Sequence, residues 1–333
     1  MHVGIVLIIR WIRSISLRSK QAALWSLLLL TCTGLSSHVG ASSPPTDPAP
    51  PDTLHIDPAS VDTLASFEAP AALHRDPRGR LYVLESDRHR FHVLNPQGEP
   101  LHTIGGRGSR TGQFDRPQGL DPTNGQVLLV ADTGNGRIQR FDDTGRHLET
   151  LPISHRDESL RSTFQTGRDE WASQGTGRPH AVRTGTSGGL VVLESDARAI
   201  WYLDDRRRTI RRLTPFDVPF DDWTPHALAR SAEREFWIVD EAAPHLLITD
   251  AFGSRVAQRT LTEDHAPHDV FATGRAVGLV YAHHLALYDA ARYAKQQHIT
   301  WPAAHPPVRA ATASRTGLYL LVGSHLLYTP RSQ

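Results

Sequence analysis

The sequence predicts an all-β fold, a six-bladed β-propeller of four-stranded antiparallel blades, and three observations lead to this prediction. A pattern of proline, glycine turn and two β-rich runs recurs six times along the 333 residues. The recurrences have the spacing of propeller blades, which repeat about every 40–50 residues. The chain also offers few helical segments of the length (about ten residues) that a parallel α/β fold needs; residues 290–297 are the best candidate and are short.

Each repeat opens with a proline, passes through a turn and ends in two short alternating strands, as an antiparallel meander requires. The six units are residues 70–98, 117–145, 179–205, 225–253, 267–289 and 306–330. Their opening residues are 47, 62, 46, 42 and about 40 positions apart. The spacing of 62 predicts an insertion within residues 152–178, a polar stretch that carries Trp171.

The second unit carries the most specific motif. It reads Val-Ala-Asp-Thr-Gly-Asn-Gly-Arg-Ile-Gln-Arg-Phe over residues 130–141, and a glycine-rich segment from Gly105 to Phe114 precedes the unit. These stretches resemble the NHL repeat and the inter-blade loop of the NHL family. The resemblance covers nearly all of residues 53–330, most strongly in the second unit, and it implies a six-bladed ring.

A closed ring must hide the edges of its first and last sheets. The last unit ends near Tyr328, which leaves room for only three strands. Residues 53–57 (Thr-Leu-His-Ile-Asp) are β-prone and alternate apolar with polar side chains. We therefore expect this N-terminal segment to supply the fourth strand of the last blade.

Residues 1–41 predict an export signal. Basic residues precede the apolar run 22–30, and small residues follow it up to the A-x-A-like cleavage site at residues 39–41. The apolar run is too short to span a bilayer comfortably. The proline-rich residues 42–52 predict an extended linker to a propeller at 53–330. The sequence thus predicts a periplasmic, cell-surface or secreted protein.

Cys32 is the only cysteine, and Leu-Leu-Thr before it makes a poor lipoprotein box. Membrane contact is therefore expected only through a lipidated Cys32 or an uncleaved signal. Removal of residues 1–41 leaves no thiol, and it leaves 32 basic against 35 acidic side chains. Nucleic-acid binders normally carry a basic surplus, so we expect no nucleic-acid partner. We also expect a monomer.

Three Pro-His pairs occupy the same place in consecutive units. They are Pro179-His180, Pro225-His226 and Pro267-His268. This place is the start of the innermost strand, which faces the central channel of a propeller. Equivalent positions of adjacent blades meet around the axis, and three histidines with one open coordination position form a catalytic zinc site.

These segments are similar to the zinc-ligand segments of the peptidyl-α-hydroxyglycine α-amidating lyase family, whose members are six-bladed NHL-like propellers; residues 267–270 match best. The resemblance implies a metal-ligand role for His180, His226 and His268. In that family the ligand histidines lie about two blades apart, whereas here they are in adjacent units. The family's catalytic tyrosine and arginine have no counterpart that we can place, so only the ligand role carries over.

A structural explanation competes with the metal site, because similar histidines of NHL repeats pack at the channel mouth and bond neighbouring backbone without metal. Acids also recur, at the end of the second strand. They are Glu85, Asp132, Glu194 and Asp240. Repeated carboxylates bind calcium in gluconolactonase-like propellers, but here we expect them to cap the following turn and to pair with Arg90 and Arg137.

Two functions follow from these residues. The first is a binding or scaffolding module for a protein, peptide or glycan, with Trp171 on its insertion and the three channel histidines as contacts. The second is a metal-dependent lyase or hydrolase in which zinc on His180, His226 and His268 lowers the pKa of its water. Fold alone does not choose between them.

Overall fold

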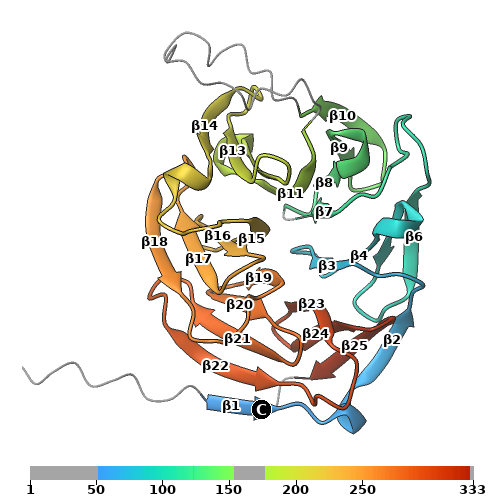
Figure 1. The fold of residues 1–333 in the computed structure, drawn as a ribbon. Coiled ribbons are helices and arrows are strands. Elements are labelled where there is room, and N and C mark those ends of the chain that lie inside the picture. The colour runs from blue at the N-terminus through green and yellow to red at the C-terminus, as the bar shows by residue number, and fades with distance from the viewer. Residues whose placement is uncertain (1–51, 123, 154–176, 331–333) are drawn as a thin grey trace, which may run out of the picture. The chain divides into compact units, whose positions relative to one another are not determined.

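The computed structural model describes residues 52–122, 124–153 and 177–330. These residues form six β-sheets that stand as blades around a central channel (Figure 1). They contain strands and short 3-10 turns but no α-helix, and none of their helical turns has the length and apolar character to cross a membrane. The prediction of an all-β, six-bladed propeller is confirmed. The predicted signal, Cys32 and Trp171 lie outside the described residues.

Blades 1 to 4 are consecutive antiparallel meanders, each with its first strand innermost (Figure 1). Blades 1 and 2 are β3 (Ala72–Arg75), β4 (Leu81–Glu85), β5 (Arg90–Leu94), β6 (Pro100–Gly105), and β7 (Gly119–Asp121), β8 (Val127–Asp132), β9 (Arg137–Asp142), β10 (His147–Pro152). Blades 3 and 4 are β11 (Pro179–Thr184), β12 (Leu190–Glu194), β13 (Ala199–Leu203), β14 (Thr209–Leu213), and β15 (Pro225–Arg230), β16 (Phe236–Asp240), β17 (His245–Thr249), β18 (Arg255–Thr260).

Blades 5 and 6 each recruit a strand from the N-terminal segment. Blade 5 is β19 (Asp269–Thr273), β20 (Ala276–Val280), β21 (His284–Asp289), β22 (Lys295–Thr300) and, at its outer edge, β1 (Asp52–His55). Blade 6 is β23 (Val308–Ala313), β24 (Gly317–Val322), β25 (His325–Pro330) and β2 (Asp62–Ser66). The ring is therefore closed by an N-terminal strand in the last blade, as expected.

The strand that closes the ring is β2, so the assignment of residues 53–57 to this role was wrong. Residues 53–55 belong to β1, which pairs in parallel with β22 of blade 5, whereas β2 pairs antiparallel with β25 of blade 6. Chain length explains the difference, because β2 ends only a few residues before β3 and can pass directly into blade 1. Leu64 and Phe67 then pack against the core between blades 6 and 1.

The blades are held in register by aromatic and aliphatic side chains buried between neighbours. Between blades 1 and 2, Phe91, Phe114 and Phe141 form a triangle with ring centroids 6.0–6.5 Å apart. Each such pair contributes about 0.5–1.5 kcal/mol beyond its buried area. This packing fixes the rotation of each blade, and equivalent positions of the innermost strands consequently meet at the axis.

The acids at the end of the second strands are fully buried and bonded. Glu85 pairs with Arg90, and Asp132 pairs with Arg137, as expected. Neither acid caps the turn that follows it, because the backbone donors to both come from the preceding loop.

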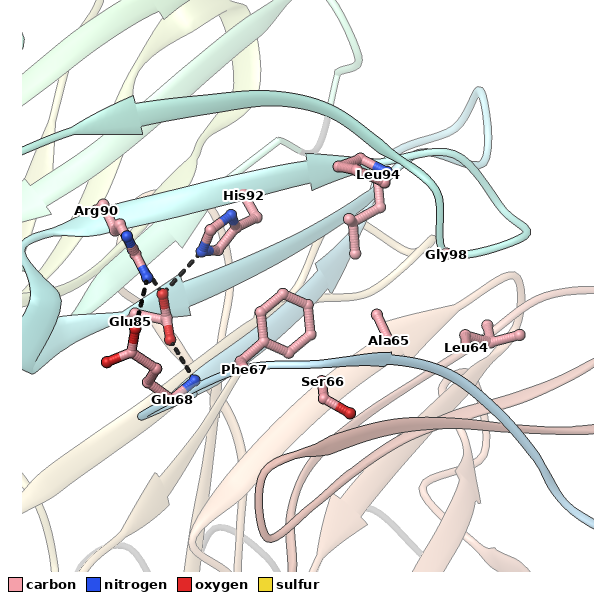
Figure 2. Close-up of a pocket in the computed structure, with 11 residues that line it drawn as sticks. Leu64, Ala65, Ser66, Phe67, Glu68, Glu85, Arg90, His92, Leu94 and Gly98 are labelled. Carbon is pink, nitrogen blue, oxygen red and sulfur yellow. Dashed lines mark hydrogen bonds and ion pairs between the residues drawn. The ribbon is translucent and has the colours of Figure 1, made fainter.

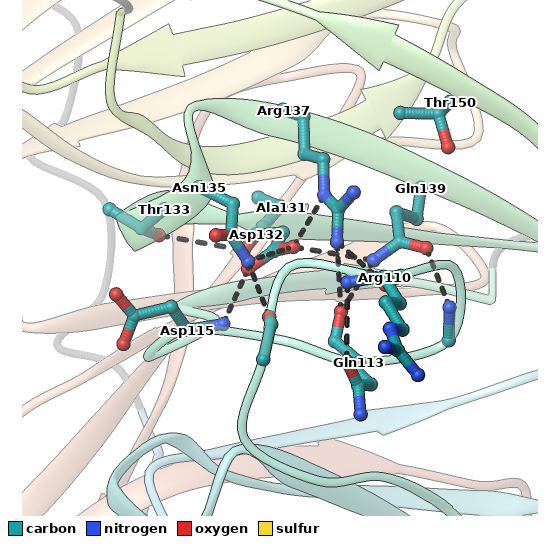
Figure 3. A network of polar contacts seen from close by, with 12 residues as sticks. Arg110, Gln113, Asp115, Ala131, Asp132, Thr133, Asn135, Arg137, Gln139 and Thr150 are labelled. Atoms are coloured by element: carbon teal, nitrogen blue, oxygen red, sulfur yellow. Dashed lines mark hydrogen bonds and ion pairs between the residues drawn. The ribbon is translucent and has the colours of Figure 1, made fainter.

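Asp132 accepts hydrogen bonds from Arg137 Nε at 2.8 Å and from the backbone N–H of Asp115 at 2.8 Å, and Asn135 Nδ2 also donates to it (Figure 3). Arg137 also donates to the backbone of the loop that joins blades 1 and 2. The network thus ties the inter-blade loop to blade 2.

Glu85 holds the same position in blade 1. It accepts from Arg90 Nε and His92 Nε2, each at 2.7 Å, and from the backbone N–H groups of Glu68 and Ala69. Burial acts to raise the pKa of Glu85, but these hydrogen bonds outweigh it and lower the pKa to about 2. The carboxylate is therefore ionised and serves as a fixed anchor between β2 and blade 1.

Candidate functional site

One position of the innermost strand meets its equivalents at a mouth of the central channel. In each blade this position lies one residue before the regular pairing of the first strand with the second. Five of the six side chains at this position are polar or titratable, and all six residues line one cavity. The residues at this position are Ala71, Gln118, His180, His226, His268 and Arg309. The cavity that they line has a volume of about 310 Å³, which is at the small end of the range for ligand pockets.

The close approach of blades 2 and 3 depends on a glycine. A Cβ at Gly119 would lie 2.6 Å from the carbonyl oxygen of His180, so no larger residue fits without moving the backbone. This contact brings the Gln118 side-chain amide to 2.7 Å from His180 Nδ1. Gln118 therefore belongs to the same polar ring as the three histidines.

Hydrogen bonds and ring packing connect the histidines to neighbouring blades around the mouth. His180 Nδ1 donates to Gln118 Oε1 of blade 2 at 2.7 Å. His268 Nε2 donates to the carbonyl oxygen of Val308 at 2.8 Å. The His180 and His226 rings also pack with centroids 4.7 Å apart. His180 and His268 thus each link their own blade to a neighbouring one.

The histidines of this ring are neutral near pH 7. Burial, followed by the nearby His226 and Arg178, lowers the pKa of His180 to about 4. Burial is also the main cause that lowers the pKa values of His226 and His268. A neutral imidazole offers one donor and one acceptor, so the ring presents polar atoms to the channel without a positive charge of its own.

Deeper in the channel lies a group of charged side chains. Arg183 projects from β11 and is 8% exposed; its Nη1 donates to the carbonyl oxygens of Leu120 at 2.9 Å and Val182 at 2.8 Å. Burial raises the pKa of Asp269 to about 7, against the lowering effects of the Val270 N–H and the Arg183 charge. Arg183 and Asp269 therefore place a cation and a readily protonated carboxyl group in the buried lining of the cavity.

A larger cavity of about 640 Å³ lies between β2 and blade 1 (Figure 2). Its apolar wall includes Phe67, Leu94 and Leu64. Its polar groups, however, bond one another, because Glu85 accepts from both Arg90 and His92. Because its polar side chains bond one another and hold blade 1 to the segment after β2, this cavity is a weaker candidate for ligand binding than the channel mouth. At the channel mouth, polar side chains from several blades line the cavity.

The structure brings His180, His226 and His268 together, as predicted from their matching places in the repeat. Within the described residues, no group of three or more His, Cys, Asp or Glu side chains is arranged to hold a metal ion. His180 Nδ1 is bonded to Gln118 and His268 Nε2 to Val308, so these nitrogens do not point to a shared centre. Zinc ligation stays a prediction, as does the contact role of Trp171.

Sequence reasoning missed Gln118, Arg183, Asp269 and Arg309. Gln118 follows the opening proline of its unit, as the histidines do, and could have been found from that place alone. Arg309 was hidden because blade 6 has one residue more between its proline and this position. Arg183 and Asp269 belong to the inner strands, and only their depth in the channel distinguishes them.

No protein-family model and no curated protein sequence matches the chain. Among solved structures, a streptogramin B lyase is 10% identical with a TM-score of 0.57, covering 80% of this chain and 96% of that one. A catalytically inactive histidine-to-alanine variant of virginiamycin B lyase from Staphylococcus aureus, with quinupristin, is 10% identical with a TM-score of 0.55, covering 78% and 79%.

The WD40 repeats of RRP9 are 11% identical with a TM-score of 0.54, covering 82% of this chain and 98% of that one. At such low identity these likenesses show the fold alone. They show that the chain has a β-propeller fold resembling those of the lyases and of WD40 proteins.

Proposed function

We propose that this protein is an exported propeller of the NHL type that acts as a binding module and takes a protein, peptide or glycan ligand at the channel mouth. The observation that carries the proposal is the convergence of Gln118, His180, His226 and Arg309 with His268 on one cavity of about 310 Å³. Converging polar side chains on a rigid scaffold are the usual form of a recognition site. The likeness to WD40 propellers supports a binding or scaffolding role.

The test is a variant that fills the mouth. Ala71 lines the cavity and is exposed, so Ala71→Trp adds bulk without disturbing the core. Ala291→Trp makes the same change in an exposed turn after β21 and is the matched control. Binding to arrays of peptides and of glycans is measured for the three proteins. We expect Ala71→Trp alone to lose the ligands; ligands that bind all three proteins equally would refute a channel-mouth site.

Export is tested separately. The mass of the protein purified from the envelope or medium of its host should correspond to cleavage after Ala41, or to a lipid on Cys32. A protein found only in the cytoplasm with residues 1–41 intact would contradict the export part of the proposal and leave the channel-mouth part standing.

The alternative is a metal-dependent lyase or hydrolase, and the meeting of three imidazoles at one mouth favours it. The likeness to propeller lyases, one inactivated by a histidine-to-alanine change, is consistent with this alternative. Metal analysis of the purified protein decides: stoichiometric zinc that disappears in a variant with His180, His226 and His268 all changed to Ala supports the enzyme. Absence of zinc from protein prepared with zinc supports the binding module.

A further inference from the structure

The guanidinium of Arg183 is the unusual group in the channel. It is more than nine-tenths buried, yet among the described residues no carboxylate forms an ion pair with it. Asp121 and Asp269 act on it only through the electrostatic field, and burial is the main cause that lowers its pKa. A buried cation without a paired anion is costly, and such perturbed groups cluster at functional sites.

The hydrogen bonds of Arg183 leave a defined part of the group for a ligand. Both hydrogens of Nη1 are used, because this nitrogen donates to the carbonyls of Leu120 and Val182. Arg183 lines the channel cavity, and no described residue accepts a hydrogen bond from its Nε or Nη2. The edge that these two nitrogens form offers two parallel N–H donors, which match the two oxygens of a carboxylate.

The rest of the cavity suits a single negative charge. Arg309 lines the mouth, is exposed, and has no ion-pair partner in the described part of the chain. The neutral histidines and Gln118 add polar contacts, and Ala181 and Ala227 leave room beside them. The carboxyl of Asp269, which also lines the cavity and interacts electrostatically with Arg183, disfavours a second negative charge on the ligand, such as that of phosphate.

We propose that the channel binds a free carboxylate, carried by a small acid or by the C-terminal end of a peptide, with its two oxygens on the Nε–Nη2 edge of Arg183. This inference rests on the proposed binding function and names the chemical class of its ligand.

The experiment compares acids with amides by titration calorimetry. The probes are N-acetylglycylglycine, its C-terminal amide, and acetate. Loss of a charge-assisted hydrogen bond weakens binding about tenfold or more, so the dipeptide acid should bind at least that much more tightly than its amide. Binding of the dipeptide acid above that of acetate identifies a peptide end as the source of the carboxylate; equal binding identifies a small acid.

Three variants locate the effect. Arg183→Gln should remove the preference for acid over amide, and Arg183→Lys, which keeps the charge but loses the two-donor edge, should reduce it. Arg211→Gln, in exposed β14, is the matched control and should keep the preference. Thermal unfolding confirms that each variant is folded, and Arg183→Lys carries the test if Arg183→Gln does not fold.

Two results would contradict the proposal that the ligand is a carboxylate. One is equal binding of acid and amide by the unmodified protein, and the other is an acid preference that remains in both Arg183→Gln and Arg183→Lys. If Ala71→Trp still blocks array ligands in that case, the binding site stands and only the ligand class is wrong. If Ala71→Trp blocks nothing, the proposed function fails as well.

Discussion

Blade 2 and the central channel each bury a charged side chain, but in the described part of the chain only the one in blade 2 is paired with an opposite charge. Asp132 is fully buried and accepts hydrogen bonds from Arg137, Asn135 and the Asp115 N–H. Arg183 is nearly as buried but donates to two backbone carbonyls and has no paired carboxylate among the described residues.

This difference distinguishes residues that hold the fold together from residues that bind a ligand. A fully bonded buried charge avoids the cost of an unsatisfied group and fixes one arrangement of the chain, because every group taken out of water has found a partner. An incompletely bonded charge raises that energy and is retained only if something else benefits. We therefore assign the Asp132 network to blade assembly and the Arg183 region to ligand binding. The predictions below test this assignment.

The largest effect is expected at Asp132. Asp132→Ala leaves Arg137 and several buried donors without their acceptor, and removal of one partner from a buried pair typically costs about 3–5 kcal/mol. We expect the free energy of unfolding, measured by urea denaturation, to fall by about 3 kcal/mol. The control is Asp143→Ala, whose partner Arg78 is half exposed, and this change should cost about 0–1 kcal/mol. Equal losses in the two variants would remove the distinction.

The low pKa of Glu85 predicts how the stability of the folded protein depends on pH. Its pKa is about 2 in the folded protein against an ordinary value of 4.5, so the folded state favours the carboxylate. This contribution is fully present above pH 4.5 and is lost as the pH falls toward 2. Glu85→Gln should cost about 2 kcal/mol near neutral pH and flatten the loss of stability in acid. Urea denaturation across that range checks this, and an unchanged acid slope would contradict it.

The smallest effect is expected at Arg183. Because its charge is unpaired, Arg183→Gln gives up only two bonds to carbonyls, and we expect the free energy of unfolding to change by about 1 kcal/mol or less in the same assay. If Arg183→Gln lowers the free energy of unfolding as much as Asp132→Ala does, Arg183 stabilises the fold as Asp132 does. The assignment of Arg183 to ligand binding would then be wrong.

Much of the fold could be predicted because its signal is local. The proline openings, glycine turns and alternating strands recur in each blade, and the ends of second strands at Glu85 and Asp132 carry the same acid–arginine pattern. The need for an N-terminal strand in the last blade also followed from the short final repeat. Which strand closes the ring did not follow, since residues 53–57 and β2 are both short, alternating segments.

The candidate site was predicted only in part. His180, His226 and His268 meet at the channel because the repeat assigns them equal places. Whether their nitrogens converge on a metal or bond the next blade depends on side-chain rotation, which spacing does not encode.

The sequence by itself determined the number of blades and the placement of His180, His226 and His268 at the axis, because both follow from a repeat that is read along the chain. Only the tertiary structure decided that β2 rather than β1 closes the ring, and that Asp132 is completely bonded while Arg183 is not. The physical reason is that pairing of buried charge depends on groups brought together from different blades, and their distances arise only when the ring is closed.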